Sequence, residues 1–197
     1  MRMLSCIDRR KFIGIVGGTM ACASNSGGGW FTRWVDDSDK PVVGIPKQWV
    51  DLRGEDVNRY GNFVLDLDLK NITPYMVLSP HFKTRGRTVN SLPPRKMWKK
   101  MAPTLKLVDR ISCDSGLKIK SIVSAYRSPA YNRAVRGRSK SYHMSNQAVD
   151  VVFDNMSAWR ASRIIRHYRD KKTGFRGGVG TYSSFVHIDT RGYNADW

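Results

Sequence analysis

Two histidines and an aspartate have the residue types and spacing that suit metal-dependent chemistry. His143 precedes Asp150 by seven positions in the stretch SYHMSNQAVDVV, and His187 lies in a later apolar stretch, SFVHIDT. A carboxylate among apolar residues needs a partner, because an unpaired buried charge is costly. Two imidazoles and a carboxylate that converge form a zinc site whose fourth position is open for water. From the residues alone, an ion pair between Asp150 and Arg127 is the alternative, and both interpretations stay open.

Neighbouring strands would bring these side chains together. Side chains alternate along a strand, so Asp150 faces away from the valines on either side of it. His187 and Asp189 share one face of the later stretch, opposite a valine and an isoleucine. If the two strands are neighbours and their Val/Ile faces form the core, the three polar residues lie on the other face. His143 then reaches them from the loop before Asp150.

The pattern along the rest of the chain indicates an α+β fold. Alternating or apolar runs predict strands, and amphipathic runs with helix-start and helix-stop residues predict helices. The predicted strands are 62–68, 117–125, 147–153 and 184–190, the predicted helices are 91–112, 128–137 and 157–170, and GFRGGVGTY (174–182) is predicted as a glycine-rich turn region. In the last helix, Trp159, Ile164, Ile165 and Tyr168 are predicted to face the core. Strands with segregated helices favour a small antiparallel central sheet with flanking helices over a parallel sheet.

The composition indicates one domain with an anionic partner. The 197 residues are enough for a domain with a core plus terminal extensions. There are 34 lysines and arginines against 16 aspartates and glutamates, a formal net charge of +18. Nucleic acid, anionic lipid and acidic cell-wall polymer all suit such a charge. Of the other two histidines, His81 is predicted to be structural, and His167 is predicted to lie at the surface or half-buried on an arginine-rich helix.

The N-terminal residues resemble an export signal. RRKFI is followed by a short apolar stretch that ends at ACA, too short to span a bilayer, which takes about 20 apolar residues. This predicts a twin-arginine-type signal peptide over 1–23. Cleavage at ACA is one outcome, and a lipid anchor at Cys22 is the other. Residues 24–74 are predicted to be a tether and N-terminal extension. Without the signal, Cys113 is the last cysteine, which excludes an internal disulfide and a Cys-rich zinc site.

Three separated motifs resemble a known family. They are SAYRSPAYNRAV, SYHMSNQAVDVV and GGVGTYSSFVHIDTRGYNADW, in this order. Together they look like the D-Ala-D-Ala carboxypeptidase-like zinc peptidases, a superfamily that includes murein endopeptidases of the bacterial periplasm and phage endolysins. Its hallmark is S-x-H-x(6)-D followed by a histidine on a later strand, which Ser141, His143, Asp150 and His187 match. The resemblance covers residues 75–197, which are predicted to form a zinc peptidase domain of the hedgehog/D-Ala-D-Ala-peptidase-like fold.

The resemblance implies a role for each matched residue. His143, Asp150 and His187 would bind zinc, which polarises the scissile carbonyl and lowers the pKa of water toward about 7. Arg127 in YRSPAYN would bind a stem-peptide carboxylate or the developing oxyanion. By their place in the motifs, Tyr126 and Ser141 are further candidates for binding substrate.

The general base departs from the pattern of the family. Many relatives carry an acid or histidine two or three residues before the last zinc histidine, but Phe185 and Ser184 occupy these positions here. Asp189 is therefore the predicted catalytic base. The alternative for Asp189 is a carboxylate that orients His187.

The sequence thus predicts an exported zinc peptidase. It would act as a carboxypeptidase or cross-link endopeptidase on peptidoglycan stem peptides, in the periplasm or cell envelope, as a monomer. The alternative is a non-catalytic domain of the same fold that binds cell wall or another polyanion, which the missing acid before His187 favours. Nucleic-acid binding rests on net charge alone and is not expected for an exported protein.

Overall fold

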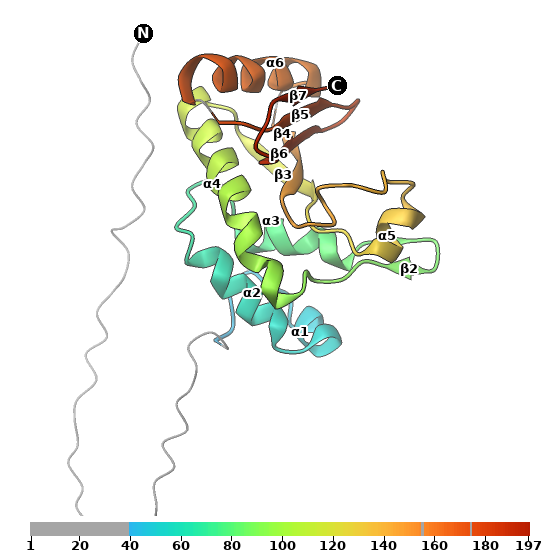
Figure 1. Cartoon of the computed structure of the whole chain (residues 1–197). Coiled ribbons are helices and arrows are strands. Elements are labelled where there is room, and N and C mark those ends of the chain that lie inside the picture. Colours follow the sequence, from blue (N-terminus) through green and yellow to red (C-terminus); the bar gives the residue numbers. More distant parts are fainter. Residues whose placement is uncertain (1–39, 155, 174) are drawn as a thin grey trace, which may run out of the picture. The chain divides into compact units, whose positions relative to one another are not determined.

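The central sheet has five strands in the order β3-β4-β6-β5-β7 (Figure 1). The computed structural model describes residues 40–197, apart from 155 and 174 and the side chains of 172 and 173. The strands are β3 (Ile119–Ser124), β4 (Ala148–Phe153), β5 (Gly178–Thr181), β6 (Val186–Asp189) and β7 (Ala195–Asp196). Neighbouring strands are antiparallel except for β5 and β7, which are parallel.

The combination of helices and a sheet is as predicted, but the prediction of a small antiparallel sheet is wrong. The sheet is mixed because β7 lies on the outer side of β5. β6 runs antiparallel to β5, and the chain reverses again near Gly192, whose φ of 90° favours glycine. A second reversal necessarily returns β7 to the direction of β5.

The two faces of the sheet differ in character. The register places Val149 opposite Ile188 and Val151 opposite Val186, and these four side chains are fully buried. Two helices, α4 (Trp98–Ser115) and α6 (Ala158–Tyr168), pack on this apolar face. Figure 1 shows α6 beside the strands and α4 running from the sheet toward α2. The other face carries the polar side chains.

Short elements, most of them before α4, complete the domain. The helices are α1 (Lys47–Arg53), α2 (Asp56–Leu65), α3 (Pro74–Leu78) and α5 (Pro129–Ala134), the shorter helical turns are η2 (Ser79–Phe82), η3 (Arg95–Met97) and η4 (Arg169–Thr173), and the hairpin is β1 (Thr84–Arg85) with β2 (Thr88–Val89). Residues from α2 and α3 join the same core cluster as α4 and the sheet. The predicted boundary between residues 74 and 75 therefore does not coincide with a break in the hydrophobic core.

Most predicted elements near the candidate site exist in the structure. The strands predicted at 117–125, 147–153 and 184–190 correspond to β3, β4 and β6. The helix predicted at 128–137 is α5, where Ser128 caps the N-terminus by accepting a hydrogen bond from the Tyr131 N–H (3.2 Å). The long predicted helix forms as η3 followed by α4, which continues through Pro103.

Three local predictions are wrong. The residues predicted as a strand at 62–68 are instead the end of α2, as far as Leu65, and the turn after it. The buried residues of α2 recur at helical spacing, Val57, Tyr60, Gly61 and Val64. The glycine-rich region predicted as a turn contains β5. Trp159 is 59% exposed and stacks under Arg163 rather than facing the core. The buried residues in that part of α6 are small, Ala158, Ala161 and Ser162, and they allow the helix to approach the sheet closely.

The predicted signal peptide, Cys22 and the tether as far as residue 39 lie outside the described residues. Within the described part, no helix is long and apolar enough to cross a membrane. Cys113 lies near the end of α4, half-buried, and its Sγ accepts a hydrogen bond from Asn71.

Asn90 connects η2 to the segment that carries Arg127. Its buried side chain donates to the carbonyl oxygens of Pro80 (3.2 Å) and Tyr126 (2.9 Å) and accepts from the Ser128 N–H (3.0 Å). Asn90→Ala removes three hydrogen bonds worth about 1 kcal/mol each, so we expect the free energy of unfolding to fall by about 3 kcal/mol. Urea denaturation measures this change. Asn194→Ala, at an exposed position, is the matched control and should cost less than about 1 kcal/mol; equal costs would contradict the role of Asn90.

Candidate metal centre

The three predicted ligands meet at one point on the polar face of the sheet. Asp150 and His187 are directly opposite each other in β4 and β6, and His143 approaches from the turn before β4. His143 Nε2 is 3.1 Å from Asp150 Oδ1, His187 Nδ1 is 2.9 Å from the same oxygen, and the two nitrogens are 3.1 Å apart. All three side chains are buried. The antiparallel register therefore brings together residues that are distant in the sequence.

Hydrogen bonds within a tight turn set the position of His143. The Oγ of Ser141 accepts from the His143 N–H (3.3 Å), and the Ser141 carbonyl accepts from the Met144 N–H (3.0 Å). Asn146 adopts a left-handed conformation with φ of 58°, and its side-chain amide donates to the Met97 carbonyl (3.0 Å). The turn is thus anchored to η3, and the predicted motif serine has a structural role in it.

Hydrogen bonds on the outer side of each imidazole decide which nitrogen faces the centre. His143 Nδ1 lies 2.6 Å from the carbonyl oxygen of Ala125, which can only accept, so this nitrogen carries the proton. His187 Nε2 lies 2.9 Å from Asp189 Oδ2 and carries its proton for the same reason. In these neutral tautomers, both inner nitrogens and the inner oxygen of Asp150 are acceptors. Three buried acceptor atoms with no hydrogen between them are unfavourable unless a cation binds between them.

The spacing of these atoms fits zinc. Zinc binds histidine nitrogen and carboxylate oxygen at about 2.0–2.2 Å in a tetrahedral arrangement, which places neighbouring ligand atoms about 3.3 Å apart. The three ligand atoms here are 2.9–3.1 Å from one another. A set of three protein ligands beside an open cleft is also the arrangement of catalytic zinc sites. The cluster can therefore hold a metal ion.

Asp150 takes part both in the candidate metal cluster and in an ion pair with Arg127, the two interpretations that the sequence left open. Its Oδ1 faces the histidines, while its Oδ2 accepts a hydrogen bond from Arg127 Nη2 at 2.6 Å. Arg127 Nε donates in turn to Ser124 Oγ at 2.8 Å. The ion pair and the metal cluster use different oxygens and are compatible.

Burial and charge set the protonation state of the cluster. Burial lowers the pKa of His143, and the attraction of Asp150 only partly offsets it. Burial raises the pKa of Asp150, but the neighbouring imidazoles of His143 and His187 favour the ionised carboxylate and hold this pKa well below its usual range. Burial lowers the pKa of His187, whereas the neighbouring carboxylates of Asp150 and Asp189 raise it more. A neutral His143 beside an ionised Asp150 suits metal binding, which requires deprotonated ligands.

Asp189 shares the strand face of His187, as predicted, but lies on the far side of its ring. The carboxylate is fully buried, and Oδ2 contacts His187 Nε2. Oδ1 accepts from the Gly178 N–H (3.0 Å), and Arg191 donates to both oxygens (2.6–3.1 Å). Burial raises the pKa of Asp189, but the hydrogen bonds from His187 and Arg191 lower it far more. This position favours the orienting alternative over the predicted base.

Arg191 is held in turn by three aromatic rings. Its guanidinium carbon lies 4.5 Å from the ring centre of Tyr142, 5.0 Å from that of Trp197 and 5.5 Å from that of Tyr193. The Trp197 ring is also 5.2 Å from the His187 ring. Cation–π attraction therefore fixes the arginine that fixes Asp189.

Two glycines of β5 make room for these groups. A Cβ at Gly178 would lie 2.6 Å from Asp189 Oδ2, and a Cβ at Gly180 would lie 2.5 Å from the Trp197 ring. Both positions face the site, since Gly180 is opposite His187 in the register. The sequence GGVGTY therefore forms a strand without side chains on one face rather than a turn.

A cleft of about 1410 Å³ opens over the cluster. Arg127, Ser141, His143, Asp150 and His187 line it, so five of the predicted site residues come together there. Two do not line it. Asp189 lies beneath His187, and Tyr126 is only 5% exposed, with its ring 6.5 Å from that of buried His81. The placement of Tyr126 in the interior does not support a contact with substrate.

Comparison with known families identifies the family of the chain. A family model described as Peptidase M15 matches residues 81–189, more than half of the chain, including all three candidate ligands. The chain belongs to the Peptidase M15 family. Members of this family are zinc-dependent peptidases, and the cluster of His143, Asp150 and His187 fits that chemistry. No curated protein and no solved structure matches the chain.

The candidate site includes residues that the sequence analysis did not single out. Arg191, Trp197 and Lys83 all line the cleft. Lys83 donates to the Val123 carbonyl (2.6 Å) from the segment after η2. Arg191 is two residues after Asp189 and lies within the motif GGVGTYSSFVHIDTRGYNADW, so the sequence could have indicated that it belongs to the site. Nothing in the local sequence around Lys83 indicates that it faces the cleft.

Proposed function

We propose that this chain is a zinc-dependent peptidase that hydrolyses peptide bonds of peptidoglycan, as a carboxypeptidase or a cross-link endopeptidase. The observation that carries the proposal is the convergence of three acceptor atoms, from His143, Asp150 and His187, on the floor of an open cleft. The membership in the M15 family supports hydrolysis of peptides. The basic net charge suits an acidic wall substrate.

A zinc ion, when bound, supplies a Lewis acid for the scissile carbonyl and makes water more acidic. The protein contributes by holding the ligands in place before substrate arrives. The Ala125 carbonyl and the Asp189 carboxylate each fix one imidazole tautomer, so that no rearrangement is needed. The cleft walls orient the peptide over this cluster.

Arg127 is the proposed partner for negative charge on the substrate. Its side chain lines the cleft and is 17% exposed, and two of its nitrogens are occupied by Ser124 and Asp150. Within the described part of the chain, the third guanidinium nitrogen has no hydrogen-bond partner. It remains able to donate to a substrate carboxylate or to the oxyanion that develops during hydrolysis.

We assign Asp189 a positioning role instead of a role in proton transfer. A carboxylate that is fully buried and bound by Arg191, Gly178 and His187 cannot approach the water side of the cluster. Among the described residues, the carboxylates that line the cleft are Asp150 and Asp196. Asp196 is bound to Arg169 by two hydrogen bonds of 2.8 and 2.9 Å, so it is committed elsewhere.

A non-catalytic domain that binds cell wall or another polyanion is the second candidate. The observation that favours it is the lack of an uncommitted acid or histidine among the described residues that line the cleft. Tyr193 and Tyr182 line it and are exposed, but neither is an acid or a histidine.

The proposed location is the periplasm or cell envelope, reached through the twin-arginine-type signal, with cleavage or lipidation at Cys22. The support for this is the sequence of the first 23 residues and the nature of the substrate. The proposed partners are stem peptides, with no nucleic acid, and the proposed state is a monomer.

Mass spectrometry of products from defined muropeptides tests the proposal. With one equivalent of zinc, we expect cleavage of one type of peptide bond, and after removal of metal by a chelator we expect none. Re-addition of zinc should restore cleavage. Binding to sacculi without any product, with zinc present, would overturn the peptidase and support the second candidate.

A further inference from the structure

The cleft is strongly asymmetric in charge. The cations that line it outnumber the acids, and they are Lys83, Arg127, Arg136, Arg138, Lys140 and Arg191. Arg127 and Arg191 are already paired with Asp150 and Asp189. The positive charge that remains comes mainly from residues 136–140, RGRSK, which we call the basic loop. The aromatic residues Tyr182 and Phe185, whose rings stack at 4.5 Å, also line the cleft.

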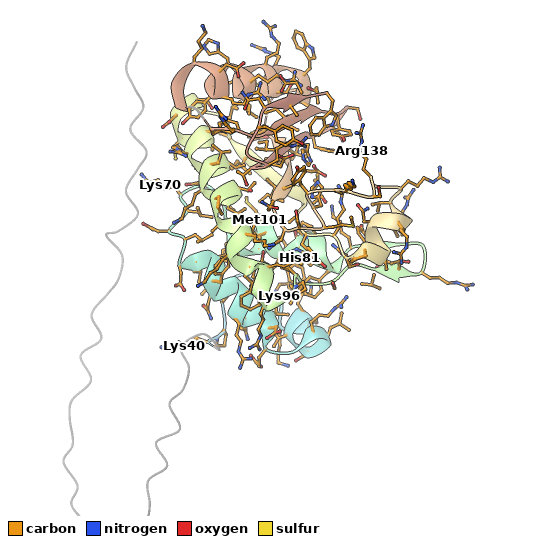
Figure 2. The ribbon with its side chains drawn as sticks, in the orientation of Figure 1. Lys40, Lys70, His81, Lys96, Met101 and Arg138 are labelled. Carbon is orange, nitrogen blue, oxygen red and sulfur yellow. The ribbon has the colours of Figure 1, made fainter. Side chains whose placement is uncertain are left out.

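The cations of the basic loop have no counter-ion in the described part of the chain. Arg136, Arg138 and Lys140 are all exposed, and neither an ion pair nor a side-chain hydrogen bond to another described residue involves them. Figure 2 shows Arg138 on the segment between α5 and β4. Three adjacent like charges repel one another, and an anionic ligand would relieve this repulsion.

The backbone of the basic loop is nevertheless held in place. Arg136 has a left-handed conformation with φ of 55°, and its N–H donates to the Arg133 carbonyl (3.0 Å). The buried side chain of Asn132 donates to the Arg138 carbonyl (3.0 Å), and its main-chain carbonyl accepts from the Gly137 N–H (2.8 Å). A Cβ at Gly137 would lie 2.1 Å from Asn132 Oδ1, so glycine is needed for this packing. The cations are therefore presented from a fixed support, which reduces the ordering cost of binding.

The basic loop is close to the ligand cluster. Lys140 is three residues before His143, so their Cα atoms are at most about 11 Å apart, the reach of three extended residues. The same span in an extended substrate is about three residues. A carboxylate within about three residues of the cleaved bond can therefore reach the loop.

We propose that the basic loop is a subsite for a carboxylate of the substrate, so that the cleft selects acidic peptides. This rests on the proposed peptidase function and deepens it. The subsite is separate from Arg127, because Arg127 comes from the segment after β3 and is engaged by Asp150. A peptide, rather than another polyanion, is favoured because these cations share a cleft with the peptidase centre.

The test compares two synthetic peptides that differ only in Glu or Gln within three residues of the cleaved bond. The variant is Arg138→Gln with Lys140→Gln. The matched control is Arg160→Gln with Lys106→Gln, which removes the same charges from exposed positions of α6 and α4, the helices that cover the apolar face of the sheet. Both variants have the same net charge, so general attraction to acidic peptides is equal.

We expect the wild-type chain to prefer the Glu peptide by about 3- to 10-fold in kcat/KM, the range for two exposed charge contacts, mainly through KM. The loop variant should lose this preference, and the control should keep it. The preference should also shrink at high salt. Equal preferences in the two variants, or no preference in the wild type, would overturn the subsite.

Fluorescence anisotropy of the same peptides, labelled, separates this proposal from the peptidase function. A wild-type chain that binds the Glu peptide more tightly without cutting it, with the difference lost in the loop variant, overturns the peptidase and supports the subsite. A chain that cuts both peptides equally overturns the subsite alone. Preferred binding of a short oligonucleotide over the Glu peptide through the same loop would overturn the assignment of a peptide carboxylate.

Discussion

Replacing His187 with alanine is expected to abolish both zinc binding and peptide hydrolysis. The substitution removes one of three atoms in a triangle with sides of 2.9–3.1 Å and leaves two ligands, too few for a stable tetrahedral site. A catalytic metal contributes several kcal/mol of transition-state stabilisation, which at 1.36 kcal/mol per factor of ten is a rate loss of about 10³-fold or more. His143→Ala should have the same effect.

Two measurements on the same samples check this result. Zinc content after dialysis against one equivalent of zinc should fall from about one ion per chain to near zero, and release of product from defined muropeptides should stop. His167→Ala is the matched control, because His167 is exposed on α6 and lies outside the cleft. It should keep both zinc and activity. A His187→Ala protein that retains a full equivalent of zinc would show that the metal binds elsewhere.

The site face could be predicted because strand alternation is a strong local signal. Asp150 and His187 each stand between β-branched residues, so a single assumption, that the two strands are neighbours, was enough to bring them together. His143 followed from its distance to Asp150 along the chain. The turn that carries it depends on Ser141 and Asn146, which are typical turn residues.

Other parts depended on tertiary contacts that no local pattern contains. The glycines of β5 are required by Arg191 and Trp197, which come later in the chain, so GGVGTY had the composition of a turn and the structure of a strand. The alternation in NFVLDLD suggested a strand, but the buried face of α2 begins before it and packs on α3 and α4. Burial against neighbouring helices outweighed a seven-residue pattern.

Strand parity also gave an incomplete account of Asp189. It correctly placed the carboxylate on the face of His187, which suggested a catalytic base. The alternation of side chains along a strand does not determine which nitrogen of the imidazole the carboxylate contacts. The register with β5 supplies Gly178 and the sequence after β6 supplies Arg191, and together they draw the carboxylate to the outer nitrogen.

Asp189→Asn is expected to weaken zinc binding by about 10- to 100-fold, the range for losing a carboxylate that orients a metal-binding histidine. The asparagine loses the charge that Arg191 and the outer nitrogen of His187 both contact, so the tautomer with Nδ1 free is no longer enforced. At saturating zinc, kcat should recover to within a few-fold of the wild-type value. A competition assay against a metal-binding dye gives the zinc affinity, and muropeptide cleavage across a zinc titration gives the rates.

Unchanged zinc affinity with a large loss of kcat in Asp189→Asn would instead identify Asp189 as a general base. Loss of a base leaves zinc affinity unchanged and lowers kcat by about 10²- to 10⁴-fold at any zinc concentration, with loss of the acidic limb of the pH–rate profile. Asp196→Asn is the matched control, because it neutralises another aspartate of the same sheet that is bound to an arginine, Arg169, but contacts neither imidazole. The control should change neither zinc affinity nor kcat by more than a few-fold. If Asp189→Asn follows the pattern of a lost base, the carboxylate must leave Arg191 during the reaction, and the positioning role assigned to it is wrong.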